Sequence, residues 1–147
     1  MLMYDAKESS LIRKKYIHSF INTKSVYYKK HVRKKKRYCD GLCYDGYLWD
    51  CLSCSQSISE EEARNTLFRK NEILIMWDIH SCEKIWIPHY WRYPKTAVLQ
   101  LDIWNSDLEI TFPEDIYCFD SSYSWSIILT HETDQDNKRW CMLARGK

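Results

Sequence analysis

Glycine and proline are scarce in this chain of 147 residues, which contains only three of each. The chain cannot supply a glycine-rich phosphate loop or a proline-rich linker, so we exclude a P-loop nucleotide hydrolase. No apolar run approaches the roughly eighteen residues of a membrane span, and charged residues within positions 1–15 exclude a secretory signal. We therefore expect a cytoplasmic protein that does not enter a membrane.

The composition predicts one globular domain over residues 1–147. Hydrophobic residues make up 45% of the chain and aromatic residues 15%, which favours a folded core over disorder. The seven cysteines are an odd number and no export signal accompanies them, so we interpret them as reduced thiols.

Charge is divided between the two ends of the chain. Residues 1–38 contain twelve lysines and arginines against two acidic residues, a balance of +10, whereas residues 39–147 have a balance of −8. This division indicates either a contact within the molecule or a basic segment that receives an acidic partner. We expect a basic N-terminal helix and arm at residues 10–38, with a short helix in 24–37 that frays into solvent.

Two helices are predicted from apolar spacing. The first covers residues 10–22, where Ile12, Tyr16 and Phe20 recur every four residues. The second begins at Ser59, which forms a capping box with Glu62, and ends near residue 70.

Strand-like segments occupy much of the remaining chain. Residues 47–53 are predicted as a first strand, and residues 73–79 and 84–87 as a hairpin. The segment 96–105 is compatible with a helix or an edge strand. Three further strands, at 115–120, 124–130 and 139–144, are expected to form a meander. The predicted fold class is α+β, a small antiparallel or mixed sheet (hairpin plus three-strand meander) with two helices packed on one face.

Two close pairs of cysteines raise the alternative of a structural zinc site, formed by Cys39, Cys43, Cys51 and Cys54. Only seven residues separate the pairs, and these include Tyr47 and Trp49, which are typical of buried structure. Cysteine also packs commonly as a small hydrophobic residue, so buried thiols are the favoured interpretation and no cofactor is predicted.

No catalytic motif is present, and none of the five histidines stands in a hydrolase or nuclease spacing. His131 and Glu132 form the most site-like polar pair. A metal-dependent hydrolase using His131, Glu132 and Asp136 is a third alternative, but we predict that the protein is not an enzyme.

The densest aromatic segment lies at residues 89–94. Tyrosine, tryptophan and arginine are enriched at binding hot spots, so this segment is either an exposed contact patch or, if Trp91 and Tyr93 fold inward, part of the core. The residues expected to contact a partner are Arg33, Lys34, Lys35, Lys36, Arg37, Tyr90, Trp91, Arg92, His131 and Glu132.

Short motifs along nearly the whole chain resemble an uncharacterised bacterial family, domain of unknown function 4275. They are Arg13-x-x-Tyr16-x-x-x-Phe20, Tyr47-Leu-Trp49 with Ser53, Glu61-Glu-Ala63 with Phe68, Asp115-Ile-Tyr117, Trp125, and Thr130-His131-Glu132. The chain departs from this pattern in its aromatic stretch from Trp86 to Trp91 and in the tail after Glu132. The resemblance implies a non-enzymatic accessory protein, and it weakens the zinc alternative because Cys51 and Cys54 fall where the family accepts ordinary strand residues.

Together these observations predict a non-catalytic interaction protein of bacterial or phage origin, of the immunity, antitoxin or anti-defence type. It would bind another protein through charged and aromatic surface. The alternative is a nucleic-acid-binding module in which residues 24–37 neutralise phosphates while Tyr27, Tyr28 and Trp91 stack on bases.

Overall fold

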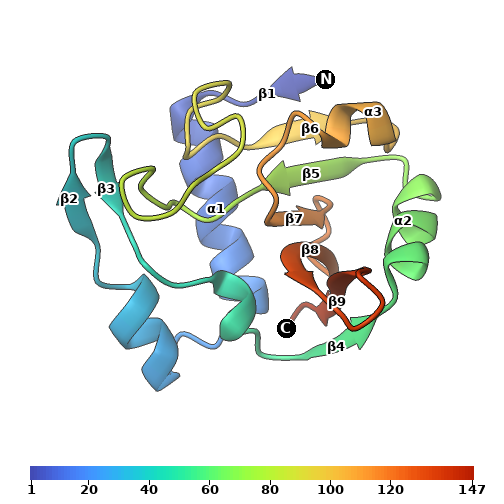
Figure 1. Cartoon of the computed structure of the whole chain (residues 1–147), viewed down its shortest axis with the longest axis horizontal. Helices are drawn as coiled ribbons and strands as arrows, with labels where there is room; N and C mark the ends of the chain where they lie inside the picture. Colours follow the sequence, from blue (N-terminus) through green and yellow to red (C-terminus); the bar gives the residue numbers. More distant parts are fainter.

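The computed structural model describes residues 1–147 and has an α+β fold, as predicted (Figure 1). Its main sheet contains seven antiparallel strands in the order β1-β6-β5-β7-β8-β9-β4. Their bounds are β1 (Leu2–Met3), β4 (Ser55–Ile58), β5 (Ile73–Met76), β6 (Leu99–Leu101), β7 (Ile116–Phe119), β8 (Trp125–Thr133) and β9 (Arg139–Arg145). The consecutive neighbours β7, β8 and β9 confirm the predicted meander.

Three α-helices and two short helical turns connect these strands. They are α1 (Ala6–Phe20), α2 (Glu60–Phe68), α3 (Ser106–Glu109), a π-helical turn (Tyr28–Val32) and a 3₁₀ turn (Leu48–Asp50). A separate two-stranded hairpin consists of β2 (Lys36–Tyr38) and β3 (Gly41–Cys43). No helix has the length and apolar character needed to cross a bilayer.

Helix α1 starts earlier than its apolar spacing suggested. The Asp5 side chain accepts a hydrogen bond from the Glu8 amide, and the Glu8 side chain bonds the Asp5 amide in return, so the capping box lies before the expected start at Ser10. In α2 the predicted cap is confirmed, because the Ser59 hydroxyl accepts from the Glu62 amide at 3.0 Å.

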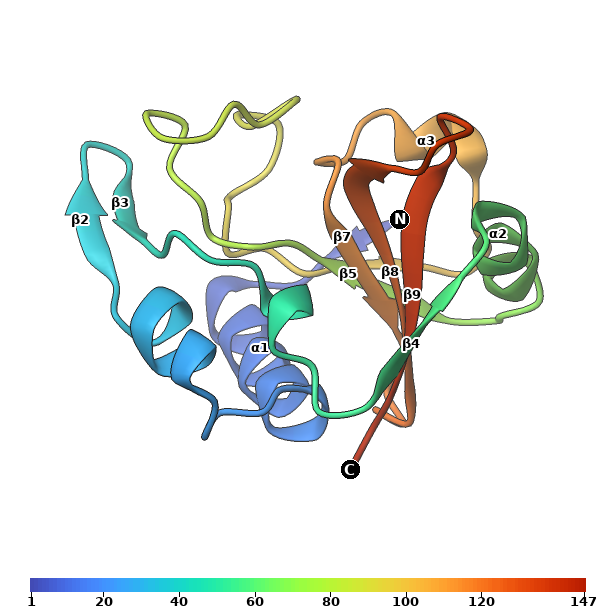
Figure 2. The same ribbon diagram turned by 60° about the horizontal axis from the view of Figure 1, so that its bottom comes forward.

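The two long helices lie on opposite faces of the sheet, and the prediction that both cover one face is wrong (Figure 2). Strand side chains alternate between faces. In β7, Tyr117 and Phe119 pack in the core cluster beneath α1, whereas Ile116 and Cys118 pack in the cluster beneath α2. Because the central strands are buried on both sides, each face needs its own cover.

Residues 47–53 contain the 3₁₀ turn (Leu48–Asp50) instead of the predicted first strand. The Leu48 amide donates to the Asp78 carboxylate and the Trp49 amide donates to the Tyr117 hydroxyl, at 3.0 Å each. These side chains accept the hydrogen bonds that a neighbouring strand would otherwise accept.

The predicted strand 84–87 is also absent, because both edges of β5 are already paired, one with β6 and the other with β7. The ambiguous segment 96–105 contains β6, an interior strand.

The basic segment is more ordered than a solvated arm. Its short helix is confirmed as the π-helical turn, but the residues after it fold back as the β2–β3 hairpin. The reversal uses Gly41 at φ +107°, a left-handed conformation that favours glycine.

Arg13, on α1, anchors the long connection between β5 and β6. Its guanidinium donates to the Trp77 carbonyl at 2.6 and 2.9 Å, to the Lys95 carbonyl at 3.0 Å and to the Thr96 carbonyl at 3.0 Å. The side chain is buried, and burial lowers the pKa of the guanidinium. Arg13 therefore holds both ends of an otherwise irregular segment at one point.

We predict that Arg13→Ala lowers the free energy of unfolding by about 3 kcal/mol, because the buried Trp77 carbonyl and the partly buried carbonyls of Lys95 and Thr96 lose a charged donor. Lys14→Ala, a neighbouring change at an exposed position, should alter stability by less than about 0.5 kcal/mol. Denaturant unfolding of both variants checks this. Equal stability of the two variants would show that Arg13 does not anchor the connection.

Candidate functional site

The aromatic loop, residues 80–95, projects two tryptophans into solvent. Trp86 is 79% exposed and Trp91 is 86% exposed. Tyr93 instead turns inward and packs near Trp77 and Phe112, with ring centroids 5.9 and 6.4 Å away. The two alternatives for this segment are thus divided between its residues: Trp91 belongs to a surface patch, and Tyr93 packs against the core.

The basic hairpin, residues 33–45, presents the predicted cations on the surface. All five residues from Arg33 to Arg37 are exposed. Lys36 alone among them forms an ion pair, at 3.3 Å, and its partner Asp45 belongs to the same hairpin. No carboxylate outside the hairpin pairs with these five residues, so most of their charge remains open to an external partner.

Asp40, at the hairpin turn, ties the basic hairpin to the aromatic loop. Its carboxylate accepts hydrogen bonds from the Ser81 hydroxyl at 3.1 Å, from the Cys82 amide at 3.3 Å and from the Tyr90 hydroxyl. Lys95 lies 3.7 Å away as an ion-pair partner. The Tyr90 bond, followed by these other contacts, holds the pKa of Asp40 below its usual value. The hairpin and the loop therefore form one continuous surface.

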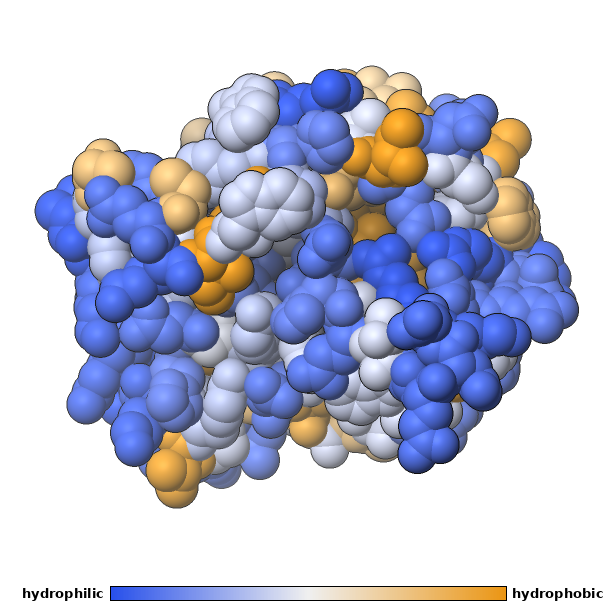
Figure 3. Space-filling view, in the orientation of Figure 1, coloured by the Kyte–Doolittle hydropathy of each residue, from blue (hydrophilic) through white to orange (hydrophobic).

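Figures 1 and 2 show the aromatic loop beside the hairpin, and Figure 2 places it between the hairpin and the strands β7 and β8. In Figure 3, hydrophilic side chains cover most of this face, while pale and orange side chains gather over the region where Figure 1 draws the loop. The face thus combines cationic and aromatic surface.

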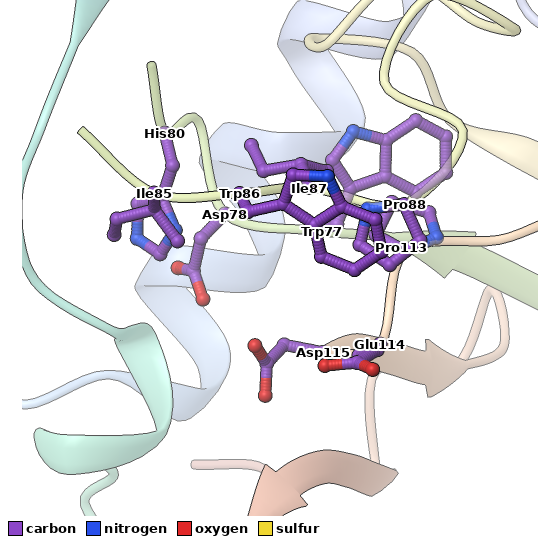
Figure 4. A pocket seen from close by; sticks show the side chains of 10 residues that line it. All are labelled: Trp77, Asp78, His80, Ile85, Trp86, Ile87, Pro88, Pro113, Glu114 and Asp115. Carbon is purple, nitrogen blue, oxygen red and sulfur yellow. The ribbon is translucent and has the colours of Figure 1, made fainter. Parts of the chain in front are cut away.

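A small cavity, of about 30 Å³, opens between the aromatic loop and the start of β7. Trp86, Asp78 and His80 line it from one side, and Glu114 and Asp115 from the other. Figure 4 shows the Asp78 and Asp115 carboxylates directed toward the same space. No lysine or arginine lines the cavity, so this part of the face is acidic.

Asp78 is a buried carboxylate held by three donors. It accepts from the Tyr44 hydroxyl at 2.8 Å, the Tyr117 hydroxyl at 2.7 Å and the Leu48 amide at 3.0 Å. Burial is the largest influence on it and raises its pKa. Asp78 is not among the residues predicted from the sequence to form a site, although an acidic residue inside the apolar run 73–79 was a usable signal.

His131 lies at an irregularity in the pairing of β8 with β9, between Leu129 and Thr133. Its Nδ1 is 3.0 Å from both oxygens of Asp115, and its amide donates to the same carboxylate at 2.8 Å. The carboxylate can only accept, so Nδ1 carries the hydrogen and Nε2 is left for another partner. Glu132, next to it, is exposed.

The tyrosines that were candidates for base stacking are not free. The Tyr27 hydroxyl donates to Asp50 at 3.1 Å and accepts from the Tyr47 amide at 3.0 Å. Tyr28 is partly buried and packs against the core beneath α1. Only Trp91, of the three aromatic residues in the nucleic-acid hypothesis, presents its ring to solvent.

The four cysteines of the zinc alternative do not come together, and no group of metal-ligand side chains has the geometry of a metal site. Cys51 lies in the core beneath α1, where its thiol donates to the Leu48 carbonyl at 3.4 Å. Cys54 is exposed and immediately precedes β4, and Cys39 and Cys43 belong to the hairpin. The 3₁₀ turn at 48–50 separates the two pairs.

No protein-family model, curated protein or solved structure matches this chain. The resemblance to domain of unknown function 4275 therefore stays a prediction. The motifs that suggested it do meet in space: the Trp49 amide bonds the Tyr117 hydroxyl, and the rings of Tyr47 and His131 lie 5.6 Å apart.

We predict that Asp40→Asn lowers the free energy of unfolding at neutral pH by about 1 kcal/mol, because a charged acceptor is lost. Since the folded-state pKa of Asp40 lies below the usual 3.8, its contribution is complete above pH 3.8 and decreases as the pH falls through the folded-state value. Unfolding curves between about pH 2 and pH 7 should therefore converge for the two proteins at the acidic end. A constant difference at all pH values would contradict this role.

Proposed function

We propose that this chain is a non-catalytic interaction protein of the cytoplasm that binds another protein. The contact surface comprises the basic hairpin, the aromatic loop and the acidic rim of the cavity beside Asp115 and His131. An immunity, antitoxin or anti-defence role, in a bacterium or phage, is the kind of function that such a surface serves.

The exposure of Trp86 and Trp91 is the observation that carries this proposal. A tryptophan that leaves water on binding contributes large apolar area, and tryptophan is enriched among residues that dominate binding energy. Asp40 and Arg13 both form hydrogen bonds with residues of the aromatic loop. These contacts support the proposal further, because a loop already held in place loses less conformational entropy on binding.

The distribution of charge favours a protein over a nucleic acid. The aromatic loop lies between the basic hairpin and the strands β7 and β8 (Figure 2), where Glu114 and Asp115 precede β7 and Glu132 belongs to β8. A phosphate backbone would meet repulsion along the acidic part. A protein can present both signs of charge, acidic opposite the hairpin and basic opposite the cavity.

We predict that Trp86→Ala combined with Trp91→Ala abolishes capture of the partner from an extract of host cells by immobilised protein. The loss of two buried indole contacts should weaken binding about a hundredfold or more. Captured proteins are compared by mass spectrometry among the wild type, this variant and Ile103→Ala, a control at another exposed apolar position. Capture that is unaffected by the tryptophan changes would contradict the proposed surface.

We predict that Arg33→Glu combined with Arg37→Glu slows association with that partner about tenfold at low salt and has little effect on its dissociation, because exposed rim charges steer encounter. Arg69→Glu with Lys138→Glu makes the same change in net charge at exposed positions outside the hairpin and serves as the control. Surface plasmon resonance at two salt concentrations measures both rates.

Fluorescence anisotropy with labelled single-stranded and double-stranded DNA and RNA tests the alternative function, a nucleic-acid-binding module. Binding that falls steeply with salt, and that Arg33→Glu with Arg37→Glu removes, would favour the nucleic-acid module. We expect no such binding near physiological salt.

A further inference from the structure

The surface that carries the aromatic loop has its charges in a fixed order. In both Figure 1 and Figure 2 the basic hairpin lies on one side of the loop, and the turn between β8 and β9 lies on the other. The exposed tryptophans, Trp86 and Trp91, belong to the loop between them. Cations therefore lie at one end of this surface, aromatic rings in its middle and acidic residues at its other end.

The acidic end is formed by two segments that lie together. The residues from His131 to Lys138 are all exposed and include three carboxylates. The Arg139 side chain, which follows them, donates to the Glu114 carbonyl, so the exposed Glu114 lies beside this turn. We define the acidic end as the four exposed carboxylates of these segments, Glu114, Glu132, Asp134 and Asp136.

The charges at the two ends have no partners within the chain. None of the four carboxylates of the acidic end forms an ion pair. In the hairpin Lys36 pairs with Asp45, and four exposed cations have no ion-pair partner: Arg33, Lys34, Lys35 and Arg37. Lys138 is the one lysine or arginine within residues 131–138, so the acidic end keeps a negative balance. The two ends are opposite in sign and similar in number.

A surface with this order of charges is complementary to a second copy of itself. A two-fold axis can cross the aromatic loop at right angles to the line from the hairpin to the acidic end. When two copies face each other about this axis, the hairpin of each meets the acidic end of the other. Both contacts then join opposite charges, and the two aromatic loops meet at the axis.

The tryptophans supply a large part of the apolar area that a dimer needs. Trp86 is 79% exposed and Trp91 is 86% exposed. A tryptophan buries about 150–250 Å², so the four from two copies provide on the order of 500–800 Å². A stable interface buries roughly 1,200–2,000 Å² in total, and the hairpin and the acidic end contribute the remainder. An aromatic centre with a charged rim is the usual composition of such an interface.

We propose that the protein forms a two-fold symmetric homodimer through this face, with the basic hairpin of each copy against the acidic end of the other and the aromatic loops at the centre. The homodimer does not require an external partner. It covers the surface that we assign to the binding of another protein, so the two complexes exclude each other. Only this competition rests on the proposed function.

Sedimentation velocity of the full-length protein tests the homodimer. Over a range of micromolar concentrations at low salt, we expect a species of about twice the monomer mass of 17.9 kDa. The dissociation constant of the dimer should rise with salt, because salt screens exposed charges.

Two charge-reversed variants test which surfaces meet. Arg33→Glu with Arg37→Glu makes the hairpin repel the acidic end, and Glu132→Lys with Asp136→Lys makes the acidic end repel the hairpin. Each variant alone should raise the dissociation constant of the dimer about tenfold or more. An equal mixture of the two should restore the dimer, because the reversed hairpin of one variant meets the reversed acidic end of the other. Pairing of the hairpin with the acidic end is required for this rescue.

Further variants separate the interface from general effects of charge and folding. Trp86→Ala with Trp91→Ala should weaken the homodimer about a hundredfold, because the apolar centre is lost. Lys7→Glu with Arg69→Glu makes the same change in net charge as the hairpin variant, at exposed positions on α1 and after α2, and should leave the dimer intact. Circular dichroism of each variant establishes that it is folded.

Three results would overturn the proposal. They are a folded wild type that is monomeric at every concentration in low salt, a dimer that neither charge-reversed variant weakens, and a mixture of the two variants that stays monomeric. Failure of the homodimer is distinguishable from failure of the proposed function. A monomer that still captures another protein through its tryptophans rejects the homodimer alone, whereas a homodimer that captures no other protein rejects the proposed function alone.

Discussion

The buried guanidinium of Arg13 is the contact on which the exposed surface depends. It bonds the carbonyls of Trp77, Lys95 and Thr96, which lie at the two ends of the connection between β5 and β6. A guanidinium suits this position because its planar fork reaches several carbonyls at once, which a lysine ammonium on its flexible stem does not reproduce. Removing a cation from water is costly, and the hydrogen bonds to these three carbonyls offset part of that cost.

Two anchors with different chemistry then support the aromatic loop. Arg13 holds its base from within the core, and Asp40 holds its outer part from the hairpin through Cys82 and Tyr90. Between them the loop leaves Trp86 and Trp91 in solvent. Exposed indoles on a loop that is held both at its base and at its outer part are typical of a recognition surface. Such a loop loses little conformational entropy when a partner binds.

The predictions succeeded where local pattern and final structure coincide. Ser59 caps α2 because capping involves residues three positions apart, and the meander β7–β8–β9 follows from short turns between apolar strands. They failed where a distant group decided the outcome. Residues 47–53 have the composition of a strand, yet Asp78 and Tyr117 bind their amides and hold them in a 3₁₀ turn. Likewise, the apolar stripe of a helix does not reveal which face of a sheet it covers.

The sequence by itself determined the fold class, the presence of the two main helices and the exposure of the cations from Arg33 to Arg37, because periodicity, capping and charge act over a few neighbouring residues. Only the tertiary structure decided that Asp40 joins the hairpin to the aromatic loop, that Asp78 is buried, and that Lys95 contacts Cys43. These contacts link residues more than thirty positions apart, and the pairing follows from how the sheet and its connections pack, which no local pattern encodes.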